Sequence, residues 1–278
     1  MQYLSVLFSF ISLLTFTLFP SCHTQPKNTF NAYMPPSFEE YFLDYEPSLP
    51  KENSLYWNVD DVDISYIQPG RNLIAFTFDD SPSSTLSGIL QVFSEYNQAY
   101  PDCRATATFF FNGKLINHFN VDHLYTAHLL GFELGNHTQN HLHLPTLSAP
   151  KLAEEIAQTD AILQTIDGKS RHLLRAPFGH VNDTVKSQVK TPIIDWSIDT
   201  RDWTGCTKEQ IYKTVWEEKF PGAIVLMHDG YPPTMSALKQ LLHDLYNANY
   251  QVVSVSAMAK MHDCALKNGS VYIRARKQ

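Results

Sequence analysis

From Arg71 onward, the sequence alternates short apolar runs, rich in β-branched and aromatic residues, with longer segments of helical periodicity. This alternation is typical of βα units, in which parallel strands are joined by helices. The pattern predicts an α/β fold, built as an incomplete (β/α) barrel of about seven parallel strands. The runs are Leu73–Phe78, Thr106–Phe111, Glu133–Asn136, His172–Arg175, Ile193–Ser197, Ala223–Met227 and Gln251–Val255.

The segments between the runs predict helices with one apolar face. In the helix expected at Ala149–Ile166, Ser148 is placed to cap the start and Gly168 to end the helix. Thr207 and Gln210 have the spacing of a capping box, which predicts a helix that begins just after Thr207. The clearest helices are expected at Ala149–Ile166, after Thr207, and at about Thr234–Ala248.

The first 70 residues differ in composition from the rest of the chain. Leu4–Phe19 is almost wholly apolar, short for a membrane span and suited to a signal peptide. We therefore expect residues 1–22 to be a signal peptide or a lipoprotein signal with Cys22 lipidated, an uncleaved anchor being the alternative. Residues 23–70 are predicted to be an irregular N-terminal extension, either packed on the domain or a flexible tether. Residues 71–278 are predicted to form the domain itself.

The bulk composition suits one sizeable globular domain and argues against a polyanionic partner. The chain has 278 residues, of which 44% are hydrophobic, and a net charge of −7. An acidic chain is poorly suited to binding nucleic acid by bulk electrostatics, whereas a neutral polymer or a small molecule is compatible with it. Outside the N-terminal segment, Cys103, Cys206 and Cys264 would allow one disulfide and one free thiol in an exported protein.

Side chains with catalytic or metal-binding chemistry stand at the ends of five of the apolar runs. Because chemistry in such barrels collects at the carboxyl ends of the strands, we expect these side chains to lie together. They are Asp79 and Asp80 after the first run, His137 and His141 after the third, Arg175 at the end of the fourth, the segment Asp195–Trp203 at the fifth, and His228 after the sixth.

His137 and His141 are four residues apart, a spacing at which two imidazoles can bind one metal ion. A carboxylate from another strand end would complete a His-His-Asp set for Zn²⁺ or a similar divalent ion, and Asp80 is the natural third ligand. Asp79 is then left beside the metal, where a general base belongs. The alternatives are an incidental histidine pair and an ordinary turn at Thr77–Ser84.

Five short motifs carry a resemblance to a known family. In chain order they are "TFDDSP", "HTQNH", "RAPFG", "DTRDW" and "LMH". Their order and approximate spacing resemble those of the polysaccharide deacetylase (NodB-homology) family, the fourth carbohydrate-esterase family, from about Asn72 to Met258. The resemblance implies a distorted (β/α) barrel and one divalent metal ion, most often Zn, with Co, Mn or Ni as other possibilities. Family members remove acetyl groups from N-acetylglucosamine polymers or oligomers and in some cases from xylan.

The resemblance also implies roles in proton transfer. Asp79 is expected to be the general base, braced by Arg175 through a charge-assisted bond. His228 is expected to be the general acid, with Asp202 holding its imidazole charged and oriented. Each of these side chains also has an ordinary structural reading, such as a surface arginine.

The remaining roles that the resemblance implies concern the metal and the substrate. The metal ligands are expected to be Asp80, His137 and His141. The backbone N–H of Phe178 is expected to stabilise the oxyanion. Trp203 and Leu226 are expected to shape the groove for the acetyl methyl group. No role is assigned to Asp195, Trp196, Asp199, Asp229, His143 or His180, and Trp196 is expected to be a core aromatic.

One position departs from the family pattern, since Ser81 stands where the first motif usually has glycine. If this position requires a positive φ, serine would strain the loop that carries both acids. If it does not, the change adds a hydroxyl group near the site. The third motif has Phe178 where tyrosine is common, which leaves a backbone role untouched.

These features predict an exported metal-dependent deacetylase acting on N-acetylated or O-acetylated carbohydrate such as chitin, chitooligosaccharide or peptidoglycan. One alternative is a catalytically silent carbohydrate-binding module of the same fold, which loss of a ligand residue would favour. Another is a hydrolase of small amides, which only the shape of the groove would distinguish. No nucleic-acid partner is expected, and membrane attachment is expected only through the N-terminus or a lipidated Cys22.

Overall fold

The computed structural model describes residues 55–276. The predicted signal segment 1–22 and most of the predicted extension 23–70 lie outside the described residues. Within residues 55–276, no helix combines the length and the apolar character that a membrane crossing requires. Cys103, Cys206 and Cys264 are free thiols, so the described part of the chain contains no disulfide between them.

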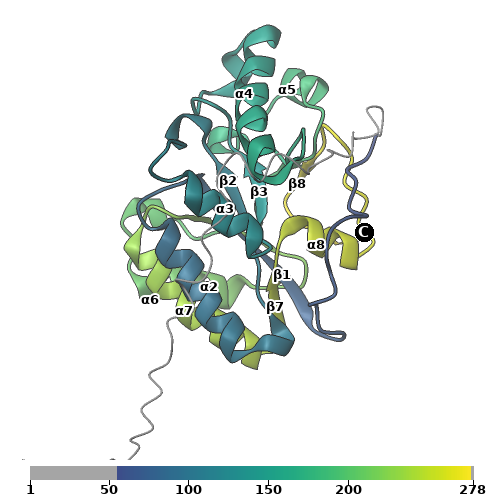
Figure 1. The fold of residues 1–278 in the computed structure, drawn as a ribbon. Coiled ribbons are helices and arrows are strands. Elements are labelled where there is room, and N and C mark those ends of the chain that lie inside the picture. Colours follow the sequence, from purple (N-terminus) through teal and green to yellow (C-terminus); the bar gives the residue numbers. More distant parts are fainter. Residues whose placement is uncertain (1–54, 277–278) are drawn as a thin grey trace, which may run out of the picture. The chain divides into compact units, whose positions relative to one another are not determined.

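The predicted α/β architecture is confirmed, with a parallel sheet built around its first strand, β1 (Figure 1). The pairings of β1 with β2, β6 and β7, of β2 with β3, and of β5 with β6 are all parallel. The carboxyl ends of these strands therefore lie at the same edge of the sheet. The strands are β1 (Asn72–Ser81), β2 (Thr108–Phe111), β3 (Glu133–Asn136), β5 (Ile198–Asp199), β6 (Ile224–His228) and β7 (Tyr250–Val253).

Two of the predicted strands are wrong: one is not a strand, and the other is shorter than predicted. The run His172–Arg175 is not a strand, because only Leu174 pairs, with Asn136 on one side and Ile193 on the other. Leu174 meets the last residue of β3 and the first residue of β4 (Ile193–Ile194), so neither neighbour overlaps it further. The run Ile193–Ser197 ends after two residues as β4, which pairs in parallel with β8 (Val271–Tyr272).

The helices begin and end close to the predicted positions. Thr207 and Gln210 form both bonds of the capping box at the start of α6. Ser148 is the N-cap of α4 without a side-chain capping bond, and Gly168 ends α4 with a φ of 73°. The helices are α2 (Leu86–Ala99), α3 (Val121–Leu129), α4 (Ala149–Asp167), α5 (Asp183–Gln188), α6 (Lys208–Glu218), α7 (Pro232–Asn247) and α8 (Val255–Met261).

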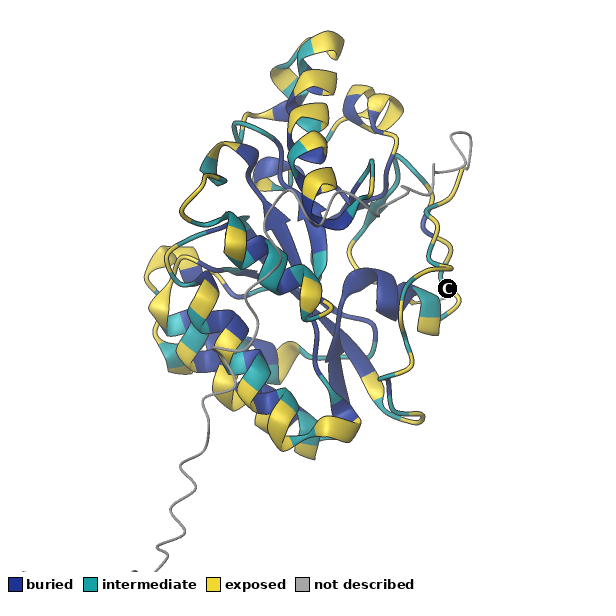
Figure 2. Cartoon of the chain, in the orientation of Figure 1, coloured by how far each residue is buried: buried dark blue, intermediate teal, exposed yellow. Residues whose placement is uncertain are grey.

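The core lies between the sheet and the apolar faces of the helices, with the strands buried and the outer helix faces exposed (Figure 2). Phe76 and Phe78 of β1 are fully buried, and the ring of Phe78 stacks on that of Phe109 with centroids 4.9 Å apart. α2 and α6 both pack against α7 on this side of the sheet. Burial on both faces explains why β1 reads as a continuous apolar run rather than an alternating one.

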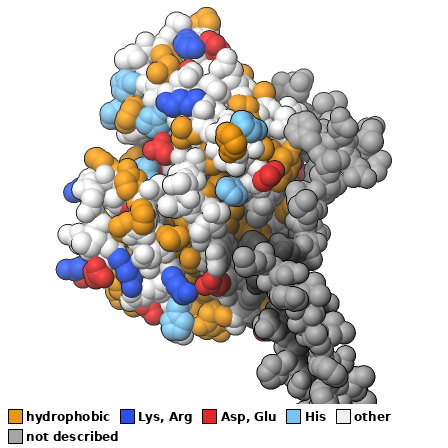
Figure 3. Space-filling view, turned by 60° about the vertical axis from the view of Figure 1, so that its left-hand side comes forward, with side chains coloured by type: hydrophobic (Ala, Val, Ile, Leu, Met, Phe, Trp, Pro, Cys, Tyr) orange, Lys and Arg blue, Asp and Glu red, His pale blue; other side chains and the backbone are white. Residues whose placement is uncertain are grey.

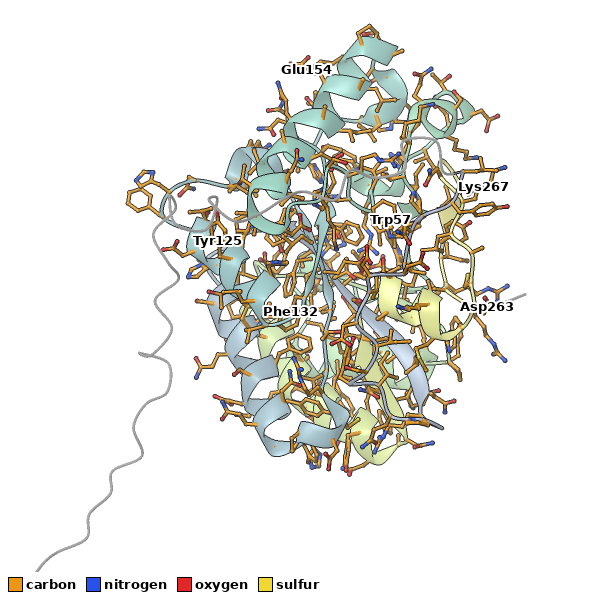
Figure 4. The ribbon with its side chains drawn as sticks, turned by 45° about the vertical axis from the view of Figure 1, so that its right-hand side comes forward. Trp57, Tyr125, Phe132, Glu154, Asp263 and Lys267 are labelled. Atoms are coloured by element: carbon orange, nitrogen blue, oxygen red, sulfur yellow. The ribbon has the colours of Figure 1, made fainter. Side chains whose placement is uncertain are left out.

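Residues 55–70, which precede the predicted start of the domain, pack on the same core. Ile67 is buried, and Trp57 packs on the cluster around Val255 and Leu266. The indole N–H of Trp57 donates to Ser256 Oγ at 3.1 Å, while Tyr56 forms an antiparallel bridge with Lys267. Trp57 and Lys267 accordingly lie on the same side of the domain in Figure 4.

Candidate active site and metal centre

The candidate site lies at the carboxyl ends of the parallel strands. Asp79 and Asp80 are near the end of β1, and His228 is the last residue of β6. Asp79 and His228 are direct register partners on these neighbouring strands. The loop after β3 brings His137 and His141 to the same edge. One acid and one histidine of the predicted proton-transfer set therefore stand side by side.

Asp80, His137 and His141 bring three metal-ligating atoms together. The Oδ1 atom of Asp80 lies 3.7 Å from Nε2 of His137 and 3.5 Å from Nε2 of His141. One ligand atom from each residue lies within 4.8 Å of the others. One carboxylate and two imidazoles are a donor set typical of zinc and related divalent ions, so these residues fit a metal ion.

The orientation of His137 is fixed by a bond on the far side of its ring. Its Nδ1 lies 2.8 Å from the backbone carbonyl oxygen of Arg175, which can only accept, so Nδ1 carries the proton. In this tautomer, Nε2 is the nitrogen that faces Asp80 and is available to a metal ion. Burial and the neighbouring His137 lower the pKa of His141, although Asp80 and Asp79 oppose this effect. A lowered pKa favours the neutral form of His141, which is the form that ligates a metal ion.

Helix α4 holds the loop that carries both histidines. Fully buried Glu155 accepts from the backbone N–H of Asn140 through Oε2 and from its side-chain amide through Oε1, both at 2.8 Å. Asp160 accepts from the side-chain amide of Asn136 at 2.8 Å. The loop needs this support because Thr138 and His141 have φ values of 67° and 56°, which are uncommon for residues with a side chain.

Asp79 is a buried carboxylate paired with a fully buried arginine. Its Oδ1 accepts from Nη1 of Arg175 at 2.8 Å, and Arg175 also donates to Thr77, Ile194 and Asp195. Burial alone would raise the pKa of Asp79, but the charge and hydrogen bond of Arg175, together with the neighbouring His137 and His228, outweigh it and the pKa is lowered. Asp79 is therefore ionised at neutral pH, as a proton acceptor must be.

His228 and Asp202 form a second charge pair at the same edge. Asp202 Oδ1 lies 2.7 Å from Nδ1 of His228, while Oδ2 accepts from the His228 backbone N–H at 2.8 Å and from the Thr234 hydroxyl at 2.7 Å. Burial lowers the pKa of His228, but the hydrogen bond to Asp202 and the charges of Asp79 and Asp202 more than compensate, so the pKa is raised. A raised pKa favours the imidazolium form that a general acid requires.

The other predicted substrate residues differ in exposure. The rings of Phe178 and Trp203 are each 56% exposed, whereas Leu226 is buried within β6. Phe178 has a φ of 62°, and its ring lies edge-on to that of His141 with centroids 4.7 Å apart. Tyr231, which the sequence analysis did not single out, is also exposed and lies 6.0 Å from the His228 ring. Exposed aromatic rings beside the site offer flat surfaces for a sugar ring.

Ser81 is not under the strain that a positive φ would cause. The positive φ in this loop, 58°, belongs to Asp80. The Ser81 hydroxyl donates to Asp229 Oδ2 at 3.0 Å, and the Ser83 backbone N–H donates to the same oxygen. Asp229 is fully buried, and burial raises its pKa to about 6. The departure from the family pattern thus adds a hydrogen bond beneath the acid pair.

Several residues near the motifs take structural places. Trp196 lies under the guanidinium of Arg175, and Asp199 accepts from the backbone N–H of Arg201 in a turn. Sequence reasoning missed Glu155 and Asp160 of α4. Their signal was present, because both stand among the apolar positions of the amphipathic helix, where a polar residue needs a partner.

Comparisons with known proteins identify the family of the chain. The family model described as polysaccharide deacetylase matches residues 67–192. A peptidoglycan-N-acetylglucosamine deacetylase of Bacillus cereus is 33% identical over 199 residues, which cover 68% of this chain and 88% of that protein. The peptidoglycan-N-acetylmuramic acid deacetylase PdaC of Bacillus subtilis is 30% identical over 77% of this chain, but only 42% of PdaC is covered. The chain thus spans less than half the length of that relative.

Solved structures give the same assignment. The structure described as T48 deacetylase with substrate matches with a TM-score of 0.67 and 28% identity, covering 76% of this chain and 99% of that one. A family 4 acetyl xylan esterase from Clostridium thermocellum, in complex with a cobalt ion, matches with a TM-score of 0.67 and 25% identity over 73% of this chain and 98% of that one. The chain therefore belongs to the polysaccharide deacetylase family, the NodB-homology enzymes of carbohydrate esterase family 4.

Proposed function

We propose that the protein is an exported, metal-dependent deacetylase that removes acetyl groups from carbohydrate. The observation that carries the proposal is the convergence of two charge pairs and one potential ligand set at a single sheet edge. Asp79 with Arg175 and His228 with Asp202 are adjacent to the Asp80, His137 and His141 cluster. A carbohydrate-binding module would have no need for an ionised base, a charged acid and open ligand positions together.

The named relatives support an acetylated glycan as substrate. They include deacetylases of peptidoglycan and chitooligosaccharide and enzymes that combine xylanase with deacetylase activity. For this chain we propose N-acetylated glycan of the chitin or peptidoglycan kind, with O-acetylated xylan as the competing substrate. Export through the N-terminal segment fits such a substrate, because these polymers lie outside the cytoplasm.

In the proposed reaction, Asp79 takes a proton from the water that attacks the acetyl carbonyl carbon. Arg175 keeps Asp79 ionised and directs its carboxylate toward the site. The backbone N–H of Phe178 donates to the oxygen of the tetrahedral oxyanion. His228 then gives its proton to the leaving amine, or to the leaving alcohol of an O-acetyl ester, so that acetate is released. Asp202 orients the imidazole for this transfer.

The residues placed to hold the divalent ion are Asp80, His137 and His141. When bound there, such an ion supplies Lewis acidity that polarises the carbonyl and acidifies water. We propose Zn²⁺, with Co²⁺, Mn²⁺ or Ni²⁺ as substitutes that the same ligands accept.

The activity is tested by measuring acetate released from chitin oligomers, peptidoglycan and acetylated xylan, with and without added Zn²⁺. We expect release from at least one of these polymers and its loss after treatment with a chelator. An absence of acetate from all three, with one metal ion bound per chain, would instead favour the silent binding module.

One tightly held divalent ion per chain is expected after dialysis against metal-free buffer. His137→Ala should lose it, because this substitution removes a ligand whose other nitrogen is already fixed by the Arg175 carbonyl. Metal analysis of both proteins provides the measurement. His118→Ala, which removes an exposed histidine, serves as the matched control and should retain the ion. Equal metal content in wild type and His137→Ala would show that the ligand set is wrong.

Glu155→Gln is expected to lower metal affinity by about 10–100-fold, as loss of a partner behind the ligands does in other sites. Asn140 presents two N–H donors to Glu155, and glutamine offers only one acceptor oxygen for them. The loop therefore loses one of its two hydrogen bonds to the side chain of residue 155. Affinity is measured by competition with a chelator, and excess metal should restore activity.

Glu154→Gln provides the matched control for this experiment. Glu154 is the neighbouring residue on α4, and its partners Lys151 and Gln158 lie on the same helix (Figure 4). Its substitution should leave metal affinity unchanged. If both variants bind metal like the wild type, the loop does not depend on Glu155.

A further inference from the structure

A second pair of histidines lies beside the candidate metal centre. Nε2 of His143 is 3.0 Å from Nδ1 of His180, with the ring centroids 5.0 Å apart and the ring planes at 82°. His143 belongs to the loop after β3, and His180 follows η5, the 3-10 turn Pro177–Gly179. Both side chains are exposed, and the family motifs leave both without a role. Two imidazole nitrogens from separate segments thus meet at the surface.

The ring of Phe178 lies near both histidine pairs, His137 with His141 and His143 with His180. Its centroid lies 4.7 Å from that of His141, 6.0 Å from that of His180 and 6.5 Å from that of His143. Histidine and hydrophobic side chains also gather together on the face shown in Figure 3, where charged side chains are scattered. The His143 and His180 pair is therefore adjacent to the candidate centre but distinct from its ligands.

The backbone on each side of the pair is fixed. The carbonyl oxygen of His143 accepts from the Thr146 backbone N–H at 3.1 Å and from its hydroxyl at 2.8 Å. The backbone N–H of His180 donates to the Pro177 carbonyl at 3.2 Å. The two imidazoles therefore approach each other from ordered segments, and only their exposed rings need to turn when a ligand binds.

We propose that His143 and His180 bind a second divalent transition-metal ion, of the Zn²⁺ class, with solvent completing its coordination. Imidazole is the commonest protein ligand for such ions. At a Zn–N distance of about 2.0–2.1 Å, two ligands of a tetrahedral ion lie about 3.3–3.4 Å apart. The observed separation of 3.0 Å is close to this value, and because both rings are exposed they can turn until both lone pairs point at one ion.

This second site is expected to be weaker than the first. Two protein ligands form fewer bonds than the Asp80, His137 and His141 set, and they bring no negative charge to the ion. The second ion should therefore be removed by dialysis while the first stays bound.

The test is a calorimetric titration of Zn²⁺ into protein that already carries one metal ion. Wild type should show a further binding event, which His143→Gln and His180→Gln should each abolish. His118→Gln, the same change at another exposed histidine, should leave it intact. Protein of variant Asp80→Asn, loaded with no metal, should still bind Zn²⁺ at the pair, which separates this inference from the proposed function.

Two results would overturn the inference. One is wild-type protein that takes up no Zn²⁺ beyond the first ion, in which case the two imidazoles merely share a hydrogen bond. The other is a second binding event that survives in both His143→Gln and His180→Gln. Thermal unfolding of each variant confirms that the fold is retained, as exposed histidines on ordered segments should permit.

Discussion

Asp79→Asn is expected to lower kcat by about 10²–10⁴-fold, the usual contribution of a positioned general base, while the metal stays bound. Asp80→Asn should lose most of both the activity and the metal. The adjacent acids differ in this way because Asp79 pairs with Arg175 and approaches His137 alone, at 3.7 Å, whereas Asp80 approaches both histidines through one oxygen atom. Activity and metal content measured on the same preparations provide the test. Equal loss of metal in the two variants would contradict this division.

The Asp79→Asn experiment needs a control for folding, because Arg175 is fully buried. Removing one partner of a buried ion pair costs about 3–5 kcal/mol where the remaining charge is left unsatisfied. Here Arg175 keeps Thr77 Oγ1 and the carbonyls of Ile194 and Asp195 as acceptors, and asparagine retains an oxygen for Nη1. We therefore expect a folded but less stable variant, as unfolding by denaturant should show.

Asp79 also links stability to pH in a defined direction. Its pKa is lowered in the folded protein because Arg175 and the neighbouring His137 and His228 together outweigh the effect of burial. The pair thus contributes stability above the unfolded-state pKa of aspartate, and this contribution is lost as the pH falls through the lower folded-state value. Loss of activity at moderately acidic pH therefore has to come from another group.

The strand ends that carry the candidate site could be predicted because apolar runs and polar ends alternate so regularly. β1 and β6 are buried on both faces, so an unbroken apolar run ends visibly at Asp79 or at His228. The run His172–Arg175 was wrongly predicted to be a strand, because burial of its side chains resembles burial in a strand. Two of those buried side chains, His172 and Arg175, are polar. His172 is held between Asp160 and Asp167, which raise its pKa to about 9 against the effect of burial.

The supporting contacts could not be predicted, because they join segments that are distant in the sequence. The place of Glu155 among the apolar positions of α4 indicates that it needs a partner, but nothing local indicates that this partner is Asn140. His143 and His180 are 37 residues apart, and only the approach of two loops brings their rings together. Local pattern therefore predicts which residues reach the edge of the sheet, whereas the partners of those residues depend on the tertiary fold.

The pH dependence of Asp202→Asn tests the proposed general acid. In wild type, the bond to Asp202 and nearby negative charges raise the pKa of His228 against the effect of burial. Asparagine removes one of those charges with little change in size. Its oxygen can still accept from the Thr234 hydroxyl and the His228 backbone N–H, which leaves its amide to donate toward Nδ1. An amide donor at Nδ1 favours the neutral ring, so the pKa of His228 should fall.

A general acid is lost as the pH rises through its pKa. The high-pH limb of kcat/KM should therefore lie at lower pH in Asp202→Asn than in wild type, with metal content unchanged. The maximum activity should fall as well, since loss of a carboxylate that orients a catalytic imidazole costs about 10⁴-fold in the serine-protease triad.

Thr234→Val is the matched control, because it removes a bond to the same Asp202 oxygen but leaves the bond to the His228 ring. Its high-pH limb should stay close to that of wild type. If the limb of Asp202→Asn overlays that of wild type, Asp202 does not set the pKa of His228. The proton given to the leaving group would then have to come from another donor at the sheet edge, with exposed Tyr231 as a candidate because its ring lies 6.0 Å from that of His228.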